Sequence, residues 1–385
     1  MFCPNCGKEV NEGTKFCPYC GKSLETNELK LSETSNEKPE TITSLVPYRK
    51  GNKWGFCDRD KNLVIQPIYD WADSFSEGLA RVELNRKYGY IDKKGNYIIP
   101  PVYDVALPFS EGLAVVGLNG KCGFIDEKGN LIIQPKYDDV WPFSESFPEG
   151  LELVKLNGKW GFIDEKGNLV IQPIYDEASP FSEGLATVWL NGKWGFIDKK
   201  GNYVIQPIYD ADSFSEGLAP VKLNGKWGFI DKKGNLVIQP IYDDRAWPFS
   251  EGLARVGIGE FPHTKYGFID KKGNLVIQPK YDDADSFSEG LARVKLNGKW
   301  GFIDKKGNYV IQPIYDGVDP FSEGLAAVGI GKYPSTKWGY VDKKGNLVIQ
   351  PIYDKAFSFS EGLALVELNG KYGFIDTKGT QYWED

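Results

Sequence analysis

Apolar and polar positions alternate in short β-type runs along most of the chain, and residues 223–243, LNGKWGFIDKKGNLVIQPIYD, show the recurring unit best. Asn224-Gly225 separates two β-prone runs. This pair predicts a type I′ hairpin turn, because both central residues of that turn need positive φ. In the run that follows, Trp227 and Phe229 are expected on one face of a strand, with Gly228 and Ile230 on the other.

The second half of the unit predicts one more strand. Asp231 to Asn235 (DKKGN) is typical of a type I turn closed by a glycine in the left-handed region. Residues 236–239 (LVIQ) form the next β-prone run, and Pro240 removes a donor, so pairing should weaken there. The unit is therefore predicted to be a three-stranded antiparallel meander. Gly228, beside the tryptophan, indicates close approach of a neighbouring backbone.

The unit recurs from residue 48 to residue 385, so we expect ten β repeats with the last one partial. Its aromatic-Gly step is found, with one cysteine variant, at Trp54-Gly55, Tyr88-Gly89, Cys122-Gly123, Trp160-Gly161, Trp194-Gly195, Trp227-Gly228, Tyr266-Gly267, Trp300-Gly301, Trp338-Gly339 and Tyr372-Gly373. One meander cannot bury its aromatic residues alone, so the repeats must stack on their neighbours. We predict an all-β fold in an open, curved, solenoid-like array, with a closed, propeller-like ring as the alternative. Gln381 to Asp385 are expected to form a degenerate third strand of the last repeat.

The unit K-W-G-F-I-D-x-K-G-N-x-V-I-x-P-x-Y-D, followed by F-S-E-G-L-A, resembles the WG-repeat family of bacterial β-repeat proteins. The resemblance covers residues 48–385. It implies a repeat scaffold and indicates little about activity. The G-K-W-G-F-I-D hairpin is also distantly similar to aromatic hairpin repeats of cell-wall-binding proteins.

Residues 1–24 carry two C-P-x-C-G-K motifs, whose cysteines are Cys3, Cys6, Cys17 and Cys20. Paired C-x-x-C turns can surround one tetrahedral Zn²⁺ with four thiolates, which leaves no open coordination position. We therefore predict one structural zinc ion. The segment resembles the small zinc ribbons that open many bacterial and archaeal proteins. Cys57 and Cys122 occupy repeat positions and are interpreted as core substitutions.

Composition and charge indicate a linker, bear on the cellular compartment, and argue against nucleic-acid binding and a membrane span. Residues 25–47 are rich in Glu, Ser, Thr and Asn and hold no aromatic residue, which predicts a flexible acidic linker. The net charge of −7 argues against a nucleic-acid-binding protein. No apolar run approaches the roughly 20 residues that span a bilayer. The cysteine usage and the absence of a visible secretory signal favour a reducing cytoplasm.

The sequence offers no set of catalytic residues, so we predict a protein that is not an enzyme. The single histidine, His263, lies in a loop insertion, and no Ser-His-Asp or Cys-His arrangement can be assembled. Asp231, Asp243 and Glu251 recur in nearly every repeat, which argues against catalysis. Asp231 is expected to cap its own turn, and Asp243 to accept bonds from backbone donors.

Two binding functions remain. The first is a protein–protein interaction scaffold; the alternative is a carbohydrate or cell-envelope binder that stacks sugars on exposed aromatic residues. Three insertions interrupt the period, at Ser144 to Glu149, Gly259 to Thr264 and Gly331 to Thr336. Loop aromatics without a core role are binding candidates. The off-consensus aromatics are candidates for the surface: Trp71, Trp141, Trp189, Trp247 and Phe357. The predicted partner-binding set is Phe261, Tyr333, Trp247 and Phe357.

Overall fold

The computed structural model describes residues 45–141, 148–260 and 262–385. They divide into two units, residues 45–173 with 382–385, and residues 174–381. The zinc-ligand candidates, the predicted linker up to residue 44 and Phe261 lie outside the described residues. In the described part of the chain the only helical element is a short 3-10 turn, η1 (Pro148–Gly150), and the fold is all-β.

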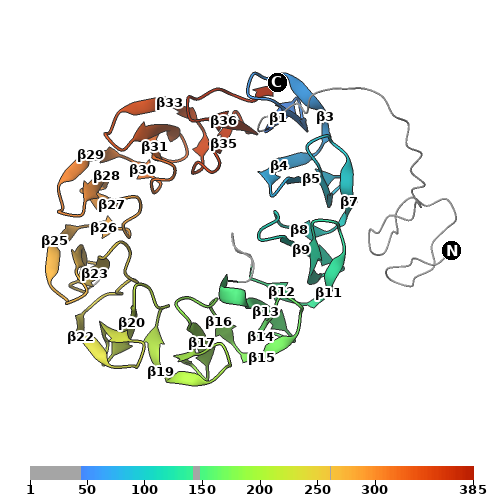
Figure 1. Ribbon diagram of the computed structural model, residues 1–385. Helices are drawn as coiled ribbons and strands as arrows, with labels where there is room; N and C mark the ends of the chain where they lie inside the picture. The colour runs from blue at the N-terminus through green and yellow to red at the C-terminus, as the bar shows by residue number, and fades with distance from the viewer. Residues whose placement is uncertain (1–44, 142–147, 261) are drawn as a thin grey trace, which may run out of the picture. The chain divides into compact units, whose positions relative to one another are not determined.

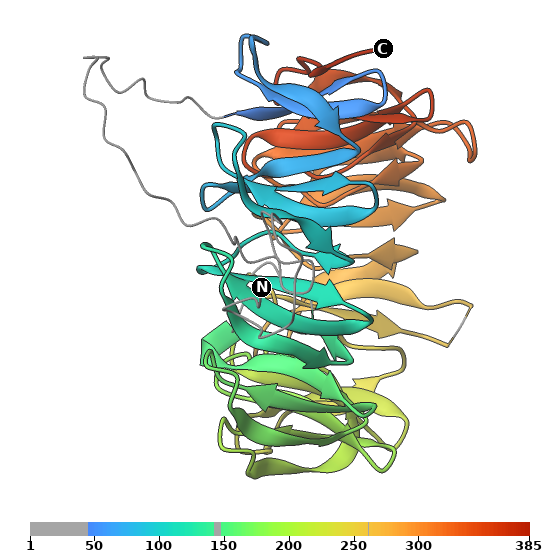
Figure 2. The ribbon, with the colours of Figure 1, turned by 90° about the vertical axis from the view of Figure 1, so that its right-hand side faces the viewer.

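The first unit holds these strands: β1 (Val46–Lys50), β2 (Lys53–Cys57), β3 (Leu63–Tyr69), β4 (Trp71–Ser76), β5 (Leu79–Leu84), β6 (Lys87–Ile91), β7 (Tyr97–Tyr103), β8 (Val105–Ala106), β9 (Leu113–Leu118), β10 (Lys121–Asp126), β11 (Leu131–Tyr137), β12 (Asp139–Val140), β13 (Glu152–Leu156), β14 (Lys159–Ile163), β15 (Leu169–Tyr175), which crosses the division, and β37 (Trp383–Glu384). Their sheets follow one another in sequence order, blue to green in Figure 1 and Figure 2, except that β37, drawn red, joins the sheet of β1, β2 and β3.

The second unit holds the remaining strands: β16 (Glu177–Ala178), β17 (Ala186–Leu190), β18 (Lys193–Ile197), β19 (Tyr203–Ala211), β20 (Leu218–Leu223), β21 (Lys226–Asp231), β22 (Leu236–Tyr242), β23 (Ala254–Ile258), β24 (Lys265–Ile269), β25 (Leu275–Tyr281), β26 (Asp283–Ala284), β27 (Leu291–Leu296), β28 (Lys299–Asp304), β29 (Tyr309–Tyr315), β30 (Gly317–Val318), β31 (Leu325–Ile330), β32 (Lys337–Asp342), β33 (Leu347–Tyr353), β34 (Lys355–Ala356), β35 (Leu363–Leu368) and β36 (Lys371–Asp376). None of the described sheets closes into a barrel.

The predicted meander is confirmed, together with its turns. In the repeat that contains β20, β21 and β22, Asn224 and Gly225 both have positive φ (49° and 83°), as a type I′ turn requires. Gly234 closes the next turn with φ 84°. Most repeats add a short further strand from the connection before the meander, such as β12 beside β13. Pairing on the third strand is interrupted after Ile238 and resumes at Tyr242, so Pro240 locally breaks the ladder without ending the strand.

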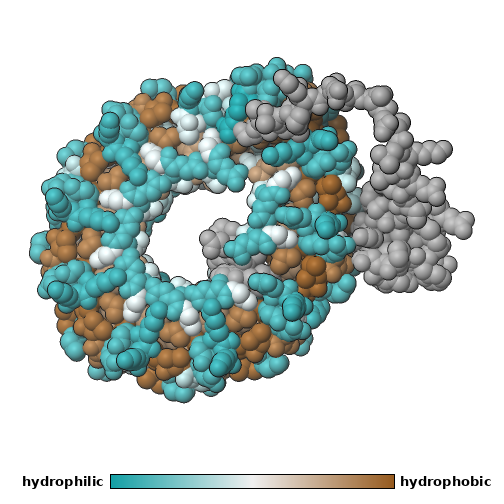
Figure 3. All heavy atoms as spheres, in the orientation of Figure 1, coloured by the Kyte–Doolittle hydropathy of each residue, from teal (hydrophilic) through white to brown (hydrophobic). Residues whose placement is uncertain are grey.

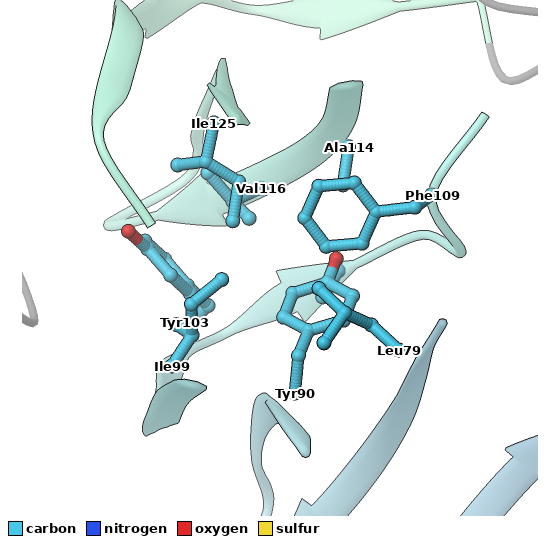
Figure 4. Close-up of a cluster of buried hydrophobic side chains, with 9 residues drawn as sticks. Leu79, Tyr90, Ile99, Tyr103, Phe109, Ala114, Val116 and Ile125 are labelled. Atoms are coloured by element: carbon cyan, nitrogen blue, oxygen red, sulfur yellow. The ribbon is translucent and has the colours of Figure 1, made fainter. Parts of the chain in front are cut away.

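Residues from both faces of the meander are buried against neighbouring repeats, as stacking requires. Phe229 of β21 packs forward with Val256 and Ile269 of the next repeat. Ile230, on the opposite face, packs backward with Phe196 and Ile205. Figure 4 shows the same arrangement in the first unit, where Tyr90 and Tyr103 meet Phe109, Val116 and Ile125 of the following repeat.

The last residues differ from the expectation. Gln381 forms a bridge with Ile375, which is the third-strand position. The expected third strand does not continue beyond it. Trp383 and Glu384 instead pair in parallel with Arg49 and Lys50 of β1, inside the first unit.

Candidate functional site

The most regular feature of the described surface is an apolar group on the third strand of the meander. In β22, Leu236, Val237 and Ile241 are 39%, 44% and 57% exposed, while Ile238 and Tyr242 are buried. We call such a group a third-strand patch. The patches comprise Leu63, Val64, Ile68, Ile98, Ile132, Leu169, Val170, Ile174, Val204, Ile208, Leu236, Val237, Ile241, Leu275, Val276, Ile314, Leu347, Val348 and Ile352. In Figure 3 brown hydrophobic surface alternates with teal hydrophilic surface from repeat to repeat.

The exposed hydrophobic residues are concentrated on these strands. Among the described residues, only six other large hydrophobic side chains are equally exposed: Val105, Trp141, Ile258, Ile330, Tyr333 and Phe357. β-Branched residues favour strands by propensity alone, but propensity does not select the solvent-facing positions of one strand in each repeat. Contiguous exposed apolar surface can mark a site of protein interaction.

The patches lie at sheet edges. The third strand is the terminal strand in most sheets, for example β29 in the order β26-β27-β28-β29. An edge strand offers unpaired backbone groups to another strand, and proline removes one of the donors. Pro313 of β29 is therefore placed to discourage sheet extension, whereas the exposed side chain of Ile314 remains available for packing.

The predicted partner-binding residues occupy different environments. Tyr333, in the loop between β31 and β32, is 93% exposed. Phe357 is 45% exposed and lies 6.5 Å from Tyr372, centroid to centroid. Trp247 is partly buried: the Arg255 guanidinium lies 3.3 Å from its ring centroid.

The structure reveals a role for the off-consensus aromatics that the sequence did not show. The ring of each one packs, tilted or edge to face, against the aromatic ring of a WG step. The pairs are Trp71 with Trp54, Trp141 with Trp160, Trp189 with Trp194, Trp247 with Tyr266, and Phe357 with Tyr372. Such ring pairs stabilise packing by roughly 0.5–1.5 kcal/mol beyond buried area. For four of the pairs the spacing along the chain did not show this, because the two rings lie in separate segments of the chain; Trp189 instead faces Trp194 across its own hairpin.

Arg255 forms the most elaborate of these arrangements. Its side chain is almost completely buried between the Trp247 and Tyr266 rings and forms ion pairs with Asp283 and Asp285. Burial, and a hydrogen bond donated to Asp244, raise the pKa of Tyr266 to about 12. The ion pairs and ring contacts give the buried guanidinium a structural role, although its Nε atom is buried without a hydrogen-bond partner.

The recurring carboxylates are used to build the fold. Asp231 accepts hydrogen bonds from the amides of Lys233 and Asn235, at 2.9 and 2.8 Å. Asp243 accepts from the Lys226 amine at 2.6 Å and from the Gly259 amide at 3.2 Å. The sequence-based interpretation of these two residues is confirmed.

Glu251 and its equivalents join successive repeats. Glu251 accepts a hydrogen bond from the Gly290 amide of the next F-S-E-G loop and pairs with Lys305 at 3.0 Å. Glu216 does the same with Gly252 and Lys271. The first lysine of the K-K-G turn thus makes an inter-repeat contact; Lys232 pairs with Glu183.

The described residues contain no group of three or more His, Cys, Asp or Glu side chains able to hold a metal ion. Cys57 is buried, which raises the pKa of its thiol to about 12, and Cys122 is half-buried. Both are free thiols in strands, in agreement with core substitution. Within the ranges that the structure describes, no helix has the length and apolar character of a membrane-spanning segment.

Comparison with solved structures shows similarity of fold. The crystal structure of a eukaryotic initiation factor has a TM-score of 0.52 at 14% identity, over 70% of this chain and 83% of that one. Hsv2p of Kluyveromyces lactis has a TM-score of 0.39 at 9% identity, over 63% of this chain and 96% of that one. No curated protein matches the sequence.

Both the N-terminal segment and the repeat region match described families. Residues 2–24 match a zinc-ribbon domain. Nine matches to the WG containing repeat cover residues 54–88, 88–122, 123–160, 160–194, 194–227, 227–260, 266–300, 300–333 and 338–372. These matches span most of the sequence, and the chain belongs to the family of proteins built from WG-containing repeats.

Proposed function

We propose that this protein is a non-enzymatic scaffold that binds a protein partner through its third-strand patches. The observation that carries the proposal is their recurrence: the same strand exposes valine, leucine or isoleucine in repeat after repeat. Patches at a regular spacing suit a partner that makes several weak apolar contacts at once, because linked contacts gain affinity through effective concentration.

The sheet edge indicates how the partner docks. An added strand would need the backbone donors of the third strand, and Pro240 supplies none. Packing on Val237 and Ile241 needs no such donor. The partner is therefore expected to present apolar side chains, as a helix or an extended segment with spaced hydrophobic residues does.

The state of the carboxylates supports a non-enzymatic role. Catalytic carboxylates usually belong to a single site in a protein. Neighbouring groups in that site shift their pKa values to suit the reaction. Asp231, Asp243 and Glu251 are instead held by structural hydrogen bonds that recur along the chain.

The insertion loops form a second proposed contact region. Thr264 donates a hydrogen bond to the Gly259 carbonyl at 3.0 Å, and Thr336 bonds Gly331 in the same way at 2.8 Å. The two loops therefore share a framework. Tyr333 is exposed on one of them, so we keep Tyr333 and Phe261, with Trp247 and Phe357, as proposed partner contacts.

The test replaces exposed valines by isosteric threonines. Val64, Val170, Val204, Val237, Val276 and Val348 lie at equivalent exposed positions. A partner captured from native lysate is identified by mass spectrometry, purified and titrated against the wild-type chain. The six-threonine variant should fold with unchanged circular dichroism and bind at least tenfold more weakly.

The matched control changes exposed glutamines on the same six strands to threonine, at Gln66, Gln172, Gln206, Gln239, Gln278 and Gln350. This variant should keep wild-type affinity. If the valine variant also keeps it, the patches are not the interface, and replacement of both insertion loops by Asn-Gly then tests the loops separately.

We further propose that Cys3, Cys6, Cys17 and Cys20 hold one structural Zn²⁺. The donor set fits this ion, because four thiolates in paired C-x-x-C turns favour a closed tetrahedral site. The similarity of residues 2–24 to a zinc ribbon supports the assignment. Elemental analysis should find one zinc per chain, lost in Cys17→Ser and kept in Cys122→Ser, with the thermal transition of the repeats unchanged. Two zinc ions per chain, or zinc retained by Cys17→Ser, would contradict it.

A further inference from the structure

One junction between repeats departs from the common spacing. In most junctions, such as Tyr175 to Phe181, the tyrosine of Y-D and the phenylalanine of F-S-E-G are six positions apart. Tyr209 and Phe214 are five positions apart, and in the next junction Tyr242 and Phe249 are seven apart. A one-residue deletion is thus followed directly by a one-residue insertion.

The deletion changes the strand. β19 continues to Ala211 and pairs both with β18 and with β20, which joins two repeats in one seven-stranded sheet. Elsewhere in the described residues the sheets hold three or four strands. Tyr209 is only half-buried, whereas its equivalents Tyr175 and Tyr242 are buried. Packing is therefore looser at this junction.

A cavity of about 400 Å³ lies at this place, inside the second unit. Trp194 and Trp227, the WG-step aromatics of the two joined repeats, contribute to its lining, together with Asp210, Asp212, Ser213 and Arg245. The volume is within the range of about 300–1,000 Å³ typical of small-molecule sites.

The adjacent insertion completes the lining. Arg245 lies within the lengthened junction, and its guanidinium forms an ion pair with Asp212 of the shortened one. The Thr187 hydroxyl lies 3.3 Å from the Ser213 hydroxyl, also in the lining. The two changes in length thus place an arginine, a carboxylate and two hydroxyls beside two indoles.

The charge of the lining selects the ligand class. Asp212 is paired with Arg245, and Asp210 lies 3.1 Å from the Lys193 amine, so both carboxylates are already neutralised. A cationic ligand would gain little attraction from carboxylates that are already paired. An anionic ligand would lie beside two carboxylates of its own charge. A purely apolar ligand would leave these polar groups without hydrogen bonds, which is costly.

We propose that this cavity binds a neutral, polyhydroxylated small molecule, a small saccharide. The Trp194 and Trp227 rings offer apolar surface for the C–H face of a sugar ring. The carboxylate of Asp212, the hydroxyl of Ser213 and the guanidinium of Arg245 offer acceptors and donors to its hydroxyls. The site does not depend on the third-strand patches, so each function can fail without the other.

The test uses the full chain and saturation-transfer difference NMR. The probes are glucose, galactose, mannose, N-acetylglucosamine, maltose and cellobiose, with glucosamine and glucuronic acid as charged counterparts. The wild-type protein should bind at least one neutral sugar more tightly than its charged counterpart. Asp212→Asn and Trp227→Phe should each weaken that binding at least tenfold, measured by titration.

Two further variants test whether the sugar binds in the cavity and not elsewhere on the surface. Trp300→Phe changes the WG-step ring of a junction with the common spacing and should leave binding unchanged. Insertion of one glutamate after Asp210 restores the six-position spacing and should abolish binding while the thermal transition is kept. The inference is overturned if no neutral sugar binds, if a charged counterpart binds more tightly, or if the glutamate insertion binds like wild type.

Discussion

Gly228 lies against the backbone of the Ile-Gln-Pro segment, residues 238–240, of its own repeat. A Cβ atom on Gly228 would lie 2.5 Å from the Ile238 carbonyl oxygen and 2.8 Å from the Pro240 nitrogen, both backbone atoms. The equivalent positions Gly55 and Gly301 are equally close to their third strands. The glycine of the WG step is thus required by close approach of the backbone. The sequence correctly indicated this approach; the neighbouring backbone belongs to the same repeat.

Gly228→Val should therefore destabilise the repeats strongly. The added side chain meets backbone that cannot rotate away, so we expect a loss of roughly 2 kcal/mol or more. Lys233→Glu is the control, because Lys233 lies exposed on a turn. Urea denaturation followed by tryptophan fluorescence compares the two variants. Equal midpoints would show that the third strand can shift away from Gly228 and make room for the valine side chain without loss of stability.

The turn aspartates predict sensitivity to acid. The hydrogen bond from Asn235 lowers the pKa of Asp231 below its usual range. A folded-state pKa below the unfolded one stabilises the protein above the unfolded pKa, and this contribution is lost as pH falls through the folded value. Asp198, Asp270 and Asp304 are shifted in the same direction.

The melting temperature should consequently be nearly constant from pH 8 to about pH 5 and fall below about pH 4. Asp231→Asn should lower it at pH 7 and differ less from wild type at pH 3, where the wild-type carboxylate is itself protonated. Calorimetry at the two pH values measures the difference. An equal difference at both would mean that the charge of Asp231 does not matter.

The F-S-E-G loops link neighbouring repeats through backbone and side-chain contacts. The Ser215 hydroxyl donates a hydrogen bond to the Phe249 carbonyl of the next loop at 2.6 Å, and Ser250 bonds Phe287 at 2.7 Å. Each glutamate adds a bond to the glycine amide of the following loop, as Glu216 does with Gly252. This explains why the motif recurs with so little change.

Glu216→Ala should loosen one such link. It removes the bond to Gly252 and the ion pair with Lys271, so we expect a loss of roughly 1–2 kcal/mol. Glu361→Ala is the matched control, because among the described residues the Glu361 carboxylate makes no hydrogen bond or ion pair to another F-S-E-G loop. Chemical denaturation should show the larger loss for Glu216→Ala; equal losses would mean that the link contributes nothing.

The sequence could predict the elements that depend on local chemistry. Asn224-Gly225 and Gly234 have the conformations that their turns require, and the meander follows from them. The sequence could not predict contacts between segments of different repeats. The pairing of Trp71 with Trp54, and of Glu216 with Lys271, depends on tertiary register that no local pattern encodes. Exposure of Val237 was missed for a similar reason, because a run such as LVIQ does not reveal which residues face solvent.

Residues 382–385 belong to the first unit although they end the sequence. Tyr382 is almost completely buried, and its carbonyl accepts a hydrogen bond from the Arg49 amide at 3.3 Å. Glu384 accepts from the Gly51 amide at 2.9 Å, and Asp385 pairs with Arg49, whose side chain is buried. The sheet of β1, β2 and β3 is therefore completed by residues distant in sequence.

Deletion of residues 382–385 should destabilise the first unit specifically. It removes a buried tyrosine and leaves Arg49 without its carboxylate, for which we expect a loss of roughly 3 kcal/mol or more. Hydrogen exchange measures the effect by position: amides of β1 and β2 should lose protection, while those of β27 and β28 in the second unit keep it. Lys50→Gln, which breaks only the exposed pair with Glu384, is the control and should change protection little. Unchanged exchange in β1 after the deletion would mean that the parallel pairing with β37 adds no stability, and that Val46 to Lys50 is held by β2 alone.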